Sequence, residues 1–325
     1  MQRLASLKLT LVLLLWLLAA VWIAYQLEWS YHVSGWGVWV LAPVMALLTI
    51  NLLAAIITNA RFRRQPALLV FHISLVLIVL LVGLGRLLHL KGWVEVTTGS
   101  EFTGQLTQYE AGPWHPGHFT ELRFINEGFD IHYSPGPRRG HTYNRMRWRD
   151  QQGREHREVI GDQTPLQIRE YRFYTSFNKG FAPTFIWKAH GEPMPQLGVV
   201  HLPAYPENTF SQAQEWTPPG ASQSIWFKLV FDEVILKPET DSVFHAPKDH
   251  KLVVRIGEGR REIGPGEELL LDDGILVYQG LNTWMGYTVY YDPTRYWLLA
   301  ACLMAIGSIG VFFWQKFSRI PWVKE

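Results

Sequence analysis

The sequence predicts a membrane protein with four transmembrane α-helices and a large extracytoplasmic domain of mainly antiparallel β-structure, either a sandwich or a partly open barrel. Two observations carry this prediction. Apolar runs long enough to cross a bilayer occupy about the first ninety residues and the last thirty. The residues between them are polar, aromatic and rich in Pro and Gly, and they are numerous enough for a domain with its own core.

Four apolar runs define the expected helices. They lie at about residues 9–25, 36–58, 67–88 and 296–313. At about 1.5 Å rise per residue, some twenty residues cover the roughly 30 Å hydrocarbon core of a bilayer. The chain therefore divides into 1–90 with three helices, 91–295 with the β-rich domain, and 296–325 with the fourth helix and a short tail.

Positive charge at the ends of the runs predicts their orientation. Basic residues precede the first run, occupy the loop 59–66 and follow the fourth run: Arg3, Lys8, Arg61, Arg63, Arg64, Lys316, Arg319 and Lys324. Lys and Arg that flank transmembrane helices are retained in the cytoplasm. We therefore expect both termini in the cytoplasm and the β-rich domain in the periplasm or its equivalent.

The middle segment shows the pattern of short strands. Runs rich in β-branched and aromatic residues are separated by Gly, Pro and Asp-Gly turn signals, and no amphipathic helix of a dozen residues intervenes. The runs are 93–98, 121–125, 130–133, 143–149, 166–173, 225–236, 250–256, 269–278 and 287–291. The Pro-rich stretch 193–220 is expected to be a long surface loop.

Composition argues against several functions. The net charge is only +2 and the middle segment has no basic block, so nucleic acid is not an expected partner. Cys302 is the single cysteine, which leaves neither an intrachain disulfide nor a Cys-x-x-Cys pair for redox chemistry. No motif predicts catalytic residues. His115 and His118 have metal-site spacing but no Cys or clustered carboxylates beside them, so we expect no metal site.

One histidine lies well inside the third apolar run. His72 follows Ala67 by five residues, so it lies about 8 Å into the bilayer. A polar side chain at that depth must gain an interaction that offsets its desolvation, which makes it a candidate functional residue. Counting 100° per residue, His72 shares one helix face with Val76, Val79, Gly83 and Arg86.

Several stretches along this four-helix plan resemble the ResB family, also called CcsB, of system II cytochrome c biogenesis. They are Leu4-Ala-Ser-Leu-Lys-Leu-Thr-Leu, Val70-Phe-His-Ile-Ser-Leu with the later Gly83, Phe129-Asp-Ile-His-Tyr-Ser-Pro-Gly, Thr164-Pro-Leu-Gln-Ile-Arg-Glu-Tyr-Arg-Phe-Tyr, and 287–293. Two positions depart from the family pattern. Thr164 stands where the family usually has Asn, and Thr294 stands where it tends to have Gly.

The resemblance implies a subunit that helps carry haem outward across the bacterial cytoplasmic (inner) membrane and present it to apocytochrome c. It implies a ResC/CcsA-type membrane partner and a non-covalent b-type haem (haem b) shared with that partner. Thiol-reducing proteins are further partners to consider. The chain would not be an enzyme alone but part of a haem-transporting cytochrome c synthase, or holocytochrome c haem-lyase, complex. In the family a histidine of the third helix helps bind haem, and the matching residue is His72.

Each candidate residue has a functional and a structural interpretation. The His72 imidazole is a suitable axial ligand for haem iron, or it hydrogen-bonds a carbonyl or Asn51 of the next helix. Asn51 itself is expected to bond a neighbouring helix. Arg86 could meet a haem propionate or a lipid headgroup. His89 and His32, near the outer ends of helices, could form a haem exit site or be solvated interfacial residues.

A second axial ligand is expected from outside this chain. His89 lies seventeen residues from His72, roughly 26 Å along a helix, so the two histidines cannot both ligate one haem iron. The face through Val76, Val79 and Gly83 would then lie against the partner. The alternative function is a membrane-anchored extracytoplasmic sensor or scaffold without haem. A haem absorption band in the purified chain distinguishes the two functions.

Overall fold

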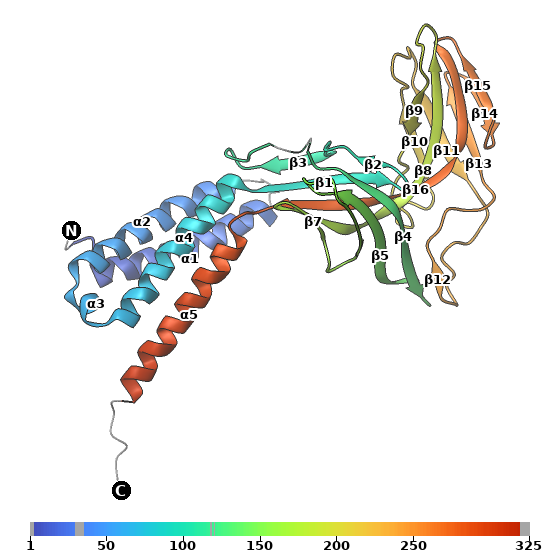
Figure 1. Cartoon of the computed structure of the whole chain (residues 1–325). Coiled ribbons are helices and arrows are strands. Elements are labelled where there is room, and N and C mark those ends of the chain that lie inside the picture. Colours follow the sequence, from blue (N-terminus) through green and yellow to red (C-terminus); the bar gives the residue numbers. More distant parts are fainter. Residues whose placement is uncertain (1–2, 30–35, 118, 120, 319–325) are drawn as a thin grey trace. The chain divides into compact units, whose positions relative to one another are not determined.

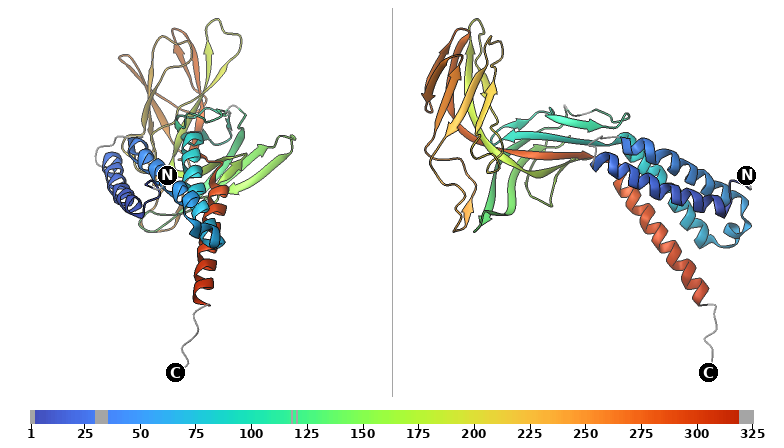
Figure 2. Two further views of the ribbon diagram at one scale, coloured as in Figure 1. Left: turned by 90° about the vertical axis from the view of Figure 1, so that its left-hand side faces the viewer. Right: turned by 180° about the vertical axis from the view of Figure 1, so that it is seen from behind.

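The computed structural model describes residues 3–29, 36–117, 119 and 121–318. The chain forms two units, whose elements are labelled in Figure 1 and seen from two other sides in Figure 2. The helical unit comprises Met1–His89, Gly112–His115 and Asp292–Glu325, and the β unit comprises Leu90–Ala111 and Pro116–Tyr291.

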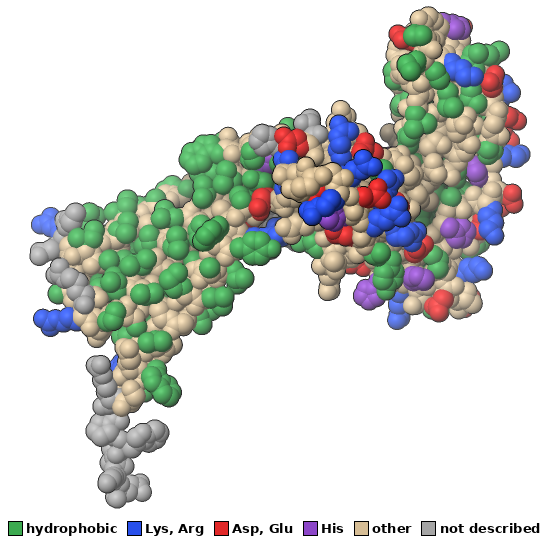
Figure 3. Space-filling view, in the orientation of Figure 1, with side chains coloured by type: hydrophobic (Ala, Val, Ile, Leu, Met, Phe, Trp, Pro, Cys, Tyr) green, Lys and Arg blue, Asp and Glu red, His purple; other side chains and the backbone are tan. Residues whose placement is uncertain are grey.

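Four long helices make up most of the helical unit. They are α1 (Leu7–Trp29), α2 (Trp36–Thr58), α4 (Pro66–Leu88) and α5 (Arg295–Phe317). Within the described residues these four are long and apolar enough to cross a membrane. A helix satisfies every interior backbone group within itself, which hydrocarbon requires because it offers no hydrogen bonds. The visible face of this unit is mostly apolar in Figure 3, whereas charge is concentrated on the β unit.

A fifth, short helix was not expected from the sequence. The loop between α2 and α4 contains α3 (Ala60–Arg64). Asn59 caps it, because its side-chain oxygen accepts a hydrogen bond from the Arg61 backbone N–H at 3.0 Å. Pro66 then opens α4 at the first helical position, where the missing N–H costs nothing.

A buried amide joins α1 to α2. Asn51 is 3% exposed, and its side-chain oxygen accepts a hydrogen bond from the Thr10 hydroxyl at 2.7 Å. Its amide nitrogen donates to the Leu4 carbonyl. The predicted structural role of Asn51 is therefore confirmed.

Small residues let α4 pack against α5. Ser74 of α4 and Ala301 of α5 are both fully buried. A Cβ placed on Gly85 would lie 2.7 Å from the Thr294 hydroxyl oxygen, so only glycine fits there. Without a hydrophobic driving force between helices in lipid, close contact of this kind is what holds them together.

The largest sheet of the β unit has seven strands. Its order is β3-β1-β16-β8-β7, with β15 paired to β16 and β9 paired to β8. The strands are β1 (Leu90–Thr97), β3 (Gln108–Ala111), β7 (Leu166–Ile168), β8 (Tyr171–Ala189), β9 (Gln196–Val199), β15 (Glu268–Leu271) and β16 (Gly274–Tyr291). The long strands β8 and β16 curl through the whole unit (Figure 1).

Two smaller sheets complete the β unit. The five-stranded sheet has the order β12-β4-β5-β6 with β2 beside β4, and the four-stranded sheet has the order β10-β11-β13-β14. Their strands are β2 (Glu101–Phe102), β4 (Phe124–Ser134), β5 (Arg138–Arg149), β6 (Glu155–Ile160), β12 (Ser242–Val243), β10 (Ala213–Trp216), β11 (Ile225–Val230), β13 (Lys251–Ile256) and β14 (Gly259–Ile263). Four helices and an antiparallel β domain confirm the predicted fold class.

Aromatic side chains fill the space between the sheets. Phe124 of β4 contacts Phe173 of β8, with ring centroids 5.0 Å apart, and Tyr287 of β16 at 5.8 Å. Further along β8, Phe185 contacts Phe227 of β11 at 4.8 Å. All five belong to one continuous core. Tyr171 and Phe173 are buried, as expected for an aromatic run in the sheet core.

A polar network lies inside this core. The Tyr287 hydroxyl donates to the Asn144 side-chain oxygen at 2.6 Å. The Asn144 amide donates to the Asn126 side-chain oxygen at 2.8 Å and to the Gly128 carbonyl at 2.9 Å. Asn126 in turn donates to the Val96 carbonyl at 3.0 Å. The network joins strands of two sheets, and these hydrogen bonds engage each of the three buried side chains.

Several expected strands have different limits in the structure, and two of them contain an unexpected turn. The run 166–173 is a tight hairpin rather than one strand: Leu166 pairs with Phe173, and the turn contains Arg169 at φ 55°. The run 269–278 is broken at a turn before Gly274, where β16 begins and continues to Tyr291. The alternation of polar and apolar residues does not reveal such turns, because it continues through the turn in the same way as along the strands.

The prediction that 193–220 is a surface loop was wrong. The stretch contains β9 and β10, and Val200, Leu202 and Tyr205 are buried. Leu202 donates its backbone N–H to the Phe181 carbonyl at 3.0 Å. The prolines interrupt strand pairing without keeping the chain on the surface, because the apolar residues between them enter the core.

One lysine is buried in the β unit. Lys179 of β8 is 1% exposed. Its ammonium lies 3.4 Å from the Phe177 carbonyl oxygen and 5.7 Å from the Tyr133 ring centroid. Burial lowers the pKa of Lys179 from 10.5 to about 8. The native state therefore holds this proton less tightly than the unfolded chain does.

We expect a pH-dependent stability from Lys179. The penalty for burying the ammonium is fully present below pH 8 and is relieved as pH rises toward 10.5. The unfolding free energy of the β unit should rise by roughly 1–2 kcal/mol between pH 8 and 9.5. Lys179→Met should remove this rise, whereas Lys188→Met, at a half-exposed position of the same strand, should retain it. Denaturant unfolding of each purified variant, followed by tryptophan fluorescence, measures its unfolding free energy at each pH. If this free energy rises equally with pH in the two variants, the pH dependence does not come from Lys179.

Candidate functional site

His72 lies in the first third of α4 with one ring nitrogen occupied. Its Nδ1 is 2.7 Å from the Leu68 carbonyl oxygen, one helical turn earlier. A carbonyl can only accept, so Nδ1 carries the proton and donates. The lone pair then resides on Nε2. This is the tautomer in which a histidine ligates a metal through Nε2 while a backbone carbonyl fixes the ring.

Two aromatic rings surround the imidazole. Phe71 lies beside it at 5.1 Å between ring centroids, and Phe62 lies at 4.7 Å, both in edge-on geometry. Phe62 belongs to α3 and is 8% exposed. Sequence reasoning missed this residue. The available signal was a single aromatic among arginines, after Asn59 as a potential helix cap.

The structure shows which of the two expected hydrogen-bond partners, a carbonyl or Asn51, His72 contacts. Its hydrogen bond goes to a carbonyl of its own helix. Asn51 is not its partner, because the Asn51 side chain bonds Thr10 and Leu4. The carbonyl bond uses one nitrogen only, so it is compatible with ligation through the other.

Arg86 and His89 form a separate pair at the end of α4. Arg86 Nη1 lies 3.0 Å from His89 Nε2, and His89 Nδ1 lies 2.7 Å from the Arg86 carbonyl oxygen. Both His89 nitrogens are thus engaged. Arg86 is fourteen residues from His72, about 21 Å along the helix, so the structure does not bring these candidates together. The remaining candidate, His32, lies outside the described residues.

The predicted face of α4 divides into two parts. Val76 is 9% exposed and is buried by the chain's own helices, so it is not open to a partner. Val79, Gly83 and Arg86 line a cavity of about 1040 Å³ together with residues of α1 and α2. A Cβ added to Gly83 would meet no atom within 4 Å. This part of the face is therefore open.

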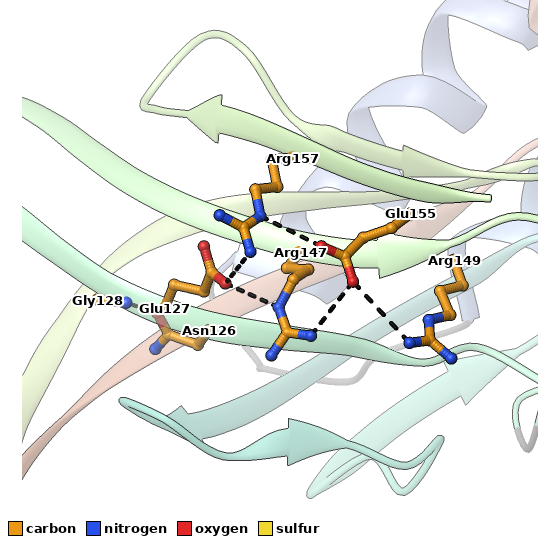
Figure 4. Close-up of polar contacts among 7 residues, drawn as sticks. All are labelled: Asn126, Glu127, Gly128, Arg147, Arg149, Glu155 and Arg157. Atoms are coloured by element: carbon orange, nitrogen blue, oxygen red, sulfur yellow. Dashed lines mark hydrogen bonds and ion pairs between the residues drawn. The ribbon is translucent and has the colours of Figure 1, made fainter.

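A charged network covers the outer face of β4, β5 and β6 (Figure 4). Arg147 donates to Glu127 at 2.7 Å and approaches Glu155 at 3.4 Å. Arg157 and Arg149 share the same carboxylates, at 3.3 Å and 3.9 Å from Glu155. The hydrogen bond that Arg147 donates to Glu127 raises the pKa of the Arg147 guanidinium. The network largely neutralises itself, which favours a solvated, structural face over a binding site.

Titratable groups do not gather into a metal site in the described part of the chain. No three His, Cys, Asp or Glu side chains there come together. His115 lies in the short segment that returns to the helical unit, where Trp114 donates its backbone N–H to the Leu87 carbonyl at 2.9 Å. His118 lies outside the described residues, so the pair is not tested.

Comparison with known protein families gives one match. The model of the ResB-like family matches residues 60–324, well over half of the chain. The chain belongs to the ResB-like family. A comparison with curated proteins gave no match. The match includes α4 with His72, and it begins after α1 and α2, so it does not cover the expected family opening at 4–11.

The ResB-like stretches of the β unit have structural roles. Phe129, Phe173 and Tyr287, one from each stretch, are core residues. These stretches therefore specify how the sheets pack. His72, in contrast, is a ligand type held inside a membrane helix, where packing alone does not require an imidazole.

The two departures from the ResB-like pattern are accommodated locally. Thr164 closes a turn through backbone bonds alone: its carbonyl accepts from Gly161 N–H at 3.0 Å, and its side chain is exposed. Thr294 is the N-cap residue of α5, and its hydroxyl donates a hydrogen bond to the Asp292 carboxylate at 2.8 Å. Its side chain fills the space that Gly85 leaves in α4. Glycine on one helix compensates for the larger residue on the other.

Proposed function

We propose that this ResB-like protein helps carry haem across the bacterial cytoplasmic membrane and present it to apocytochrome c, together with a ResC/CcsA-type partner. The observation that carries the proposal is the state of His72. Within a membrane helix its Nδ1 is satisfied by Leu68 and its Nε2 lone pair is available. Such an imidazole is suited to hold haem iron.

The residues around His72 fit a single axial ligand. The Leu68 carbonyl fixes the tautomer, and Phe62 and Phe71 place apolar rings beside the imidazole. Bound haem b would supply the iron centre that His72 ligates and the group that is delivered. His89 lies at the far end of α4, so the second ligand would come from the partner subunit. Arg86 and His89 would act at a separate, later position.

Absorption spectroscopy tests the proposal. The full chain should be purified with its membrane partner, without added haem, and its visible spectrum recorded. We expect a haem Soret band that His72 variants weaken. The sensor or scaffold function would be favoured instead if the complex contains both subunits but shows no Soret band, although the cells from which it was purified still mature cytochrome c.

The orientation of the chain is part of this proposal. Basic residues at the N-terminal end of α1, in α3 and after α5 are expected on the cytoplasmic side. Alkaline phosphatase fused after Gly104 should therefore be active, and the same enzyme fused after Arg63 should be inactive. Comparable protein levels on immunoblots provide the control. The opposite activity pattern would rule out delivery of haem to an extracytoplasmic cytochrome by the β unit.

A further inference from the structure

One cavity of the helical unit lies between α1, α2 and α4. Its volume is about 1040 Å³. Its lining is mostly apolar and includes Leu41 of α2 and Val79 and Gly83 of α4, with Tyr25, Arg86 and Trp114 as larger polar or amphipathic members. Leu80 and Val82 are 58% and 52% exposed, so the cavity opens to the surroundings of the helices. His72 is not among these residues.

The cavity is one leaflet deep. Along α4 it extends from Val79 to Leu87, and along α2 from Gly37 to Ile50. At about 1.5 Å per residue these lengths are roughly 12 and 20 Å, against roughly 15 Å for half of a hydrocarbon core. Both segments lie in the half of the bundle that the charge pattern places toward the outer surface. The space therefore has the length of an acyl chain.

The charged and amphipathic side chains of the lining lie toward one end of the cavity. Deeper inside, the Thr49 hydroxyl is already satisfied by the Met45 carbonyl at 2.8 Å. Arg86 is charged, unlike the other described residues of the lining, and it lies near the end of α4. Tyr25 and Trp114, which are exposed, provide the amphipathic rings found at membrane interfaces. Among the described residues of the lining there is no histidine or cysteine.

We propose that this cavity binds a phospholipid with an anionic headgroup. An acyl chain would lie along Val79 and Gly83, and the phosphate would meet the Arg86 guanidinium. Arg86 can face both His89 and a phosphate, because a guanidinium has five N–H donors. The lipid would supply packing at Gly83, where an added Cβ would meet no atom within 4 Å.

Native mass spectrometry of the full chain in detergent tests lipid binding. The protein is first delipidated and then incubated with phosphatidylglycerol or phosphatidylethanolamine of equal chain length. We expect one phosphatidylglycerol bound in preference to phosphatidylethanolamine. Arg86→Gln should lower this preference by about fivefold, the effect expected for one cation near an anionic headgroup. His89→Gln, which keeps the arginine, should retain the preference. Equal binding of the two lipids by the unmodified chain would overturn the proposal.

A matched pair of substitutions tests the location. Gly83→Phe fills the cavity, whereas Gly307→Phe places the same side chain on α5, where a Cβ also meets nothing within 4 Å. Gly83→Phe should reduce bound phosphatidylglycerol at least fivefold, and Gly307→Phe should not. Equal retention by the two variants, each with the unmodified chain's helical circular dichroism, would overturn the proposal. A lost Soret band in Gly83→Phe with unchanged lipid would also overturn it, because the cavity would then hold haem.

Discussion

His72→Ala is expected to yield a membrane complex that still assembles but carries much less haem and matures little cytochrome c. The substitution removes the Nε2 lone pair while leaving α4 intact, since alanine is a strong helix former. We expect at least a tenfold loss of covalently haem-stained cytochrome c. The measurements are the Soret absorbance per mole of purified complex and haem staining of the product.

Imidazole rescue separates ligation from packing. His72→Gly should regain haem when free imidazole is supplied, because the small ligand can enter the vacated position. His89→Ala is the matched control, since it removes a histidine from the far end of the same helix, and it should have a much smaller effect. Normal haem content in His72→Ala would show that His72 is only a packed residue bonded to Leu68. That result would contradict haem ligation by His72, on which the proposed function rests, but it would leave the proposed lipid site at Gly83 untouched.

Asn144→Ala is expected to destabilise the β unit by roughly 3–5 kcal/mol. The change leaves the buried Tyr287 hydroxyl without its acceptor and removes donors to Asn126 and Gly128. Each unsatisfied buried polar group costs about 1–3 kcal/mol. Denaturant unfolding of the purified chain, monitored by tryptophan fluorescence, gives the free-energy change.

The double variant distinguishes a network from a simple loss of volume. Tyr287→Phe alone should cost about 1–3 kcal/mol, and Asn144→Ala with Tyr287→Phe should cost less than the sum of the two. Asn282→Ala, at an exposed position of β16, should change stability by less than about 0.5 kcal/mol. Strict additivity, or an Asn144→Ala effect no larger than that of Asn282→Ala, would contradict the role of the network.

Much of the candidate site could be recognised before the structure. A histidine within an apolar run is conspicuous from residue types alone, and the stretch around His72 carried the family resemblance. The contact with Phe62 could not be predicted, because it depends on α3 turning back toward α4. The same holds for the Arg86–His89 pair, which depends on side-chain conformations at a helix end rather than on spacing.

The sequence by itself determined that four segments form helices long and apolar enough to cross a membrane and that the middle of the chain is antiparallel β-structure. These properties depend on the length and polarity of contiguous segments, which are local. Only the tertiary structure decided that β8 and β16 run unbroken through the β unit, that Leu202 and Tyr205 enter the core, and that Gly83 faces a cavity. Each of these depends on which distant segments pack together, and in a close-packed interior a neighbour's shape, not a residue's own polarity, decides what is buried.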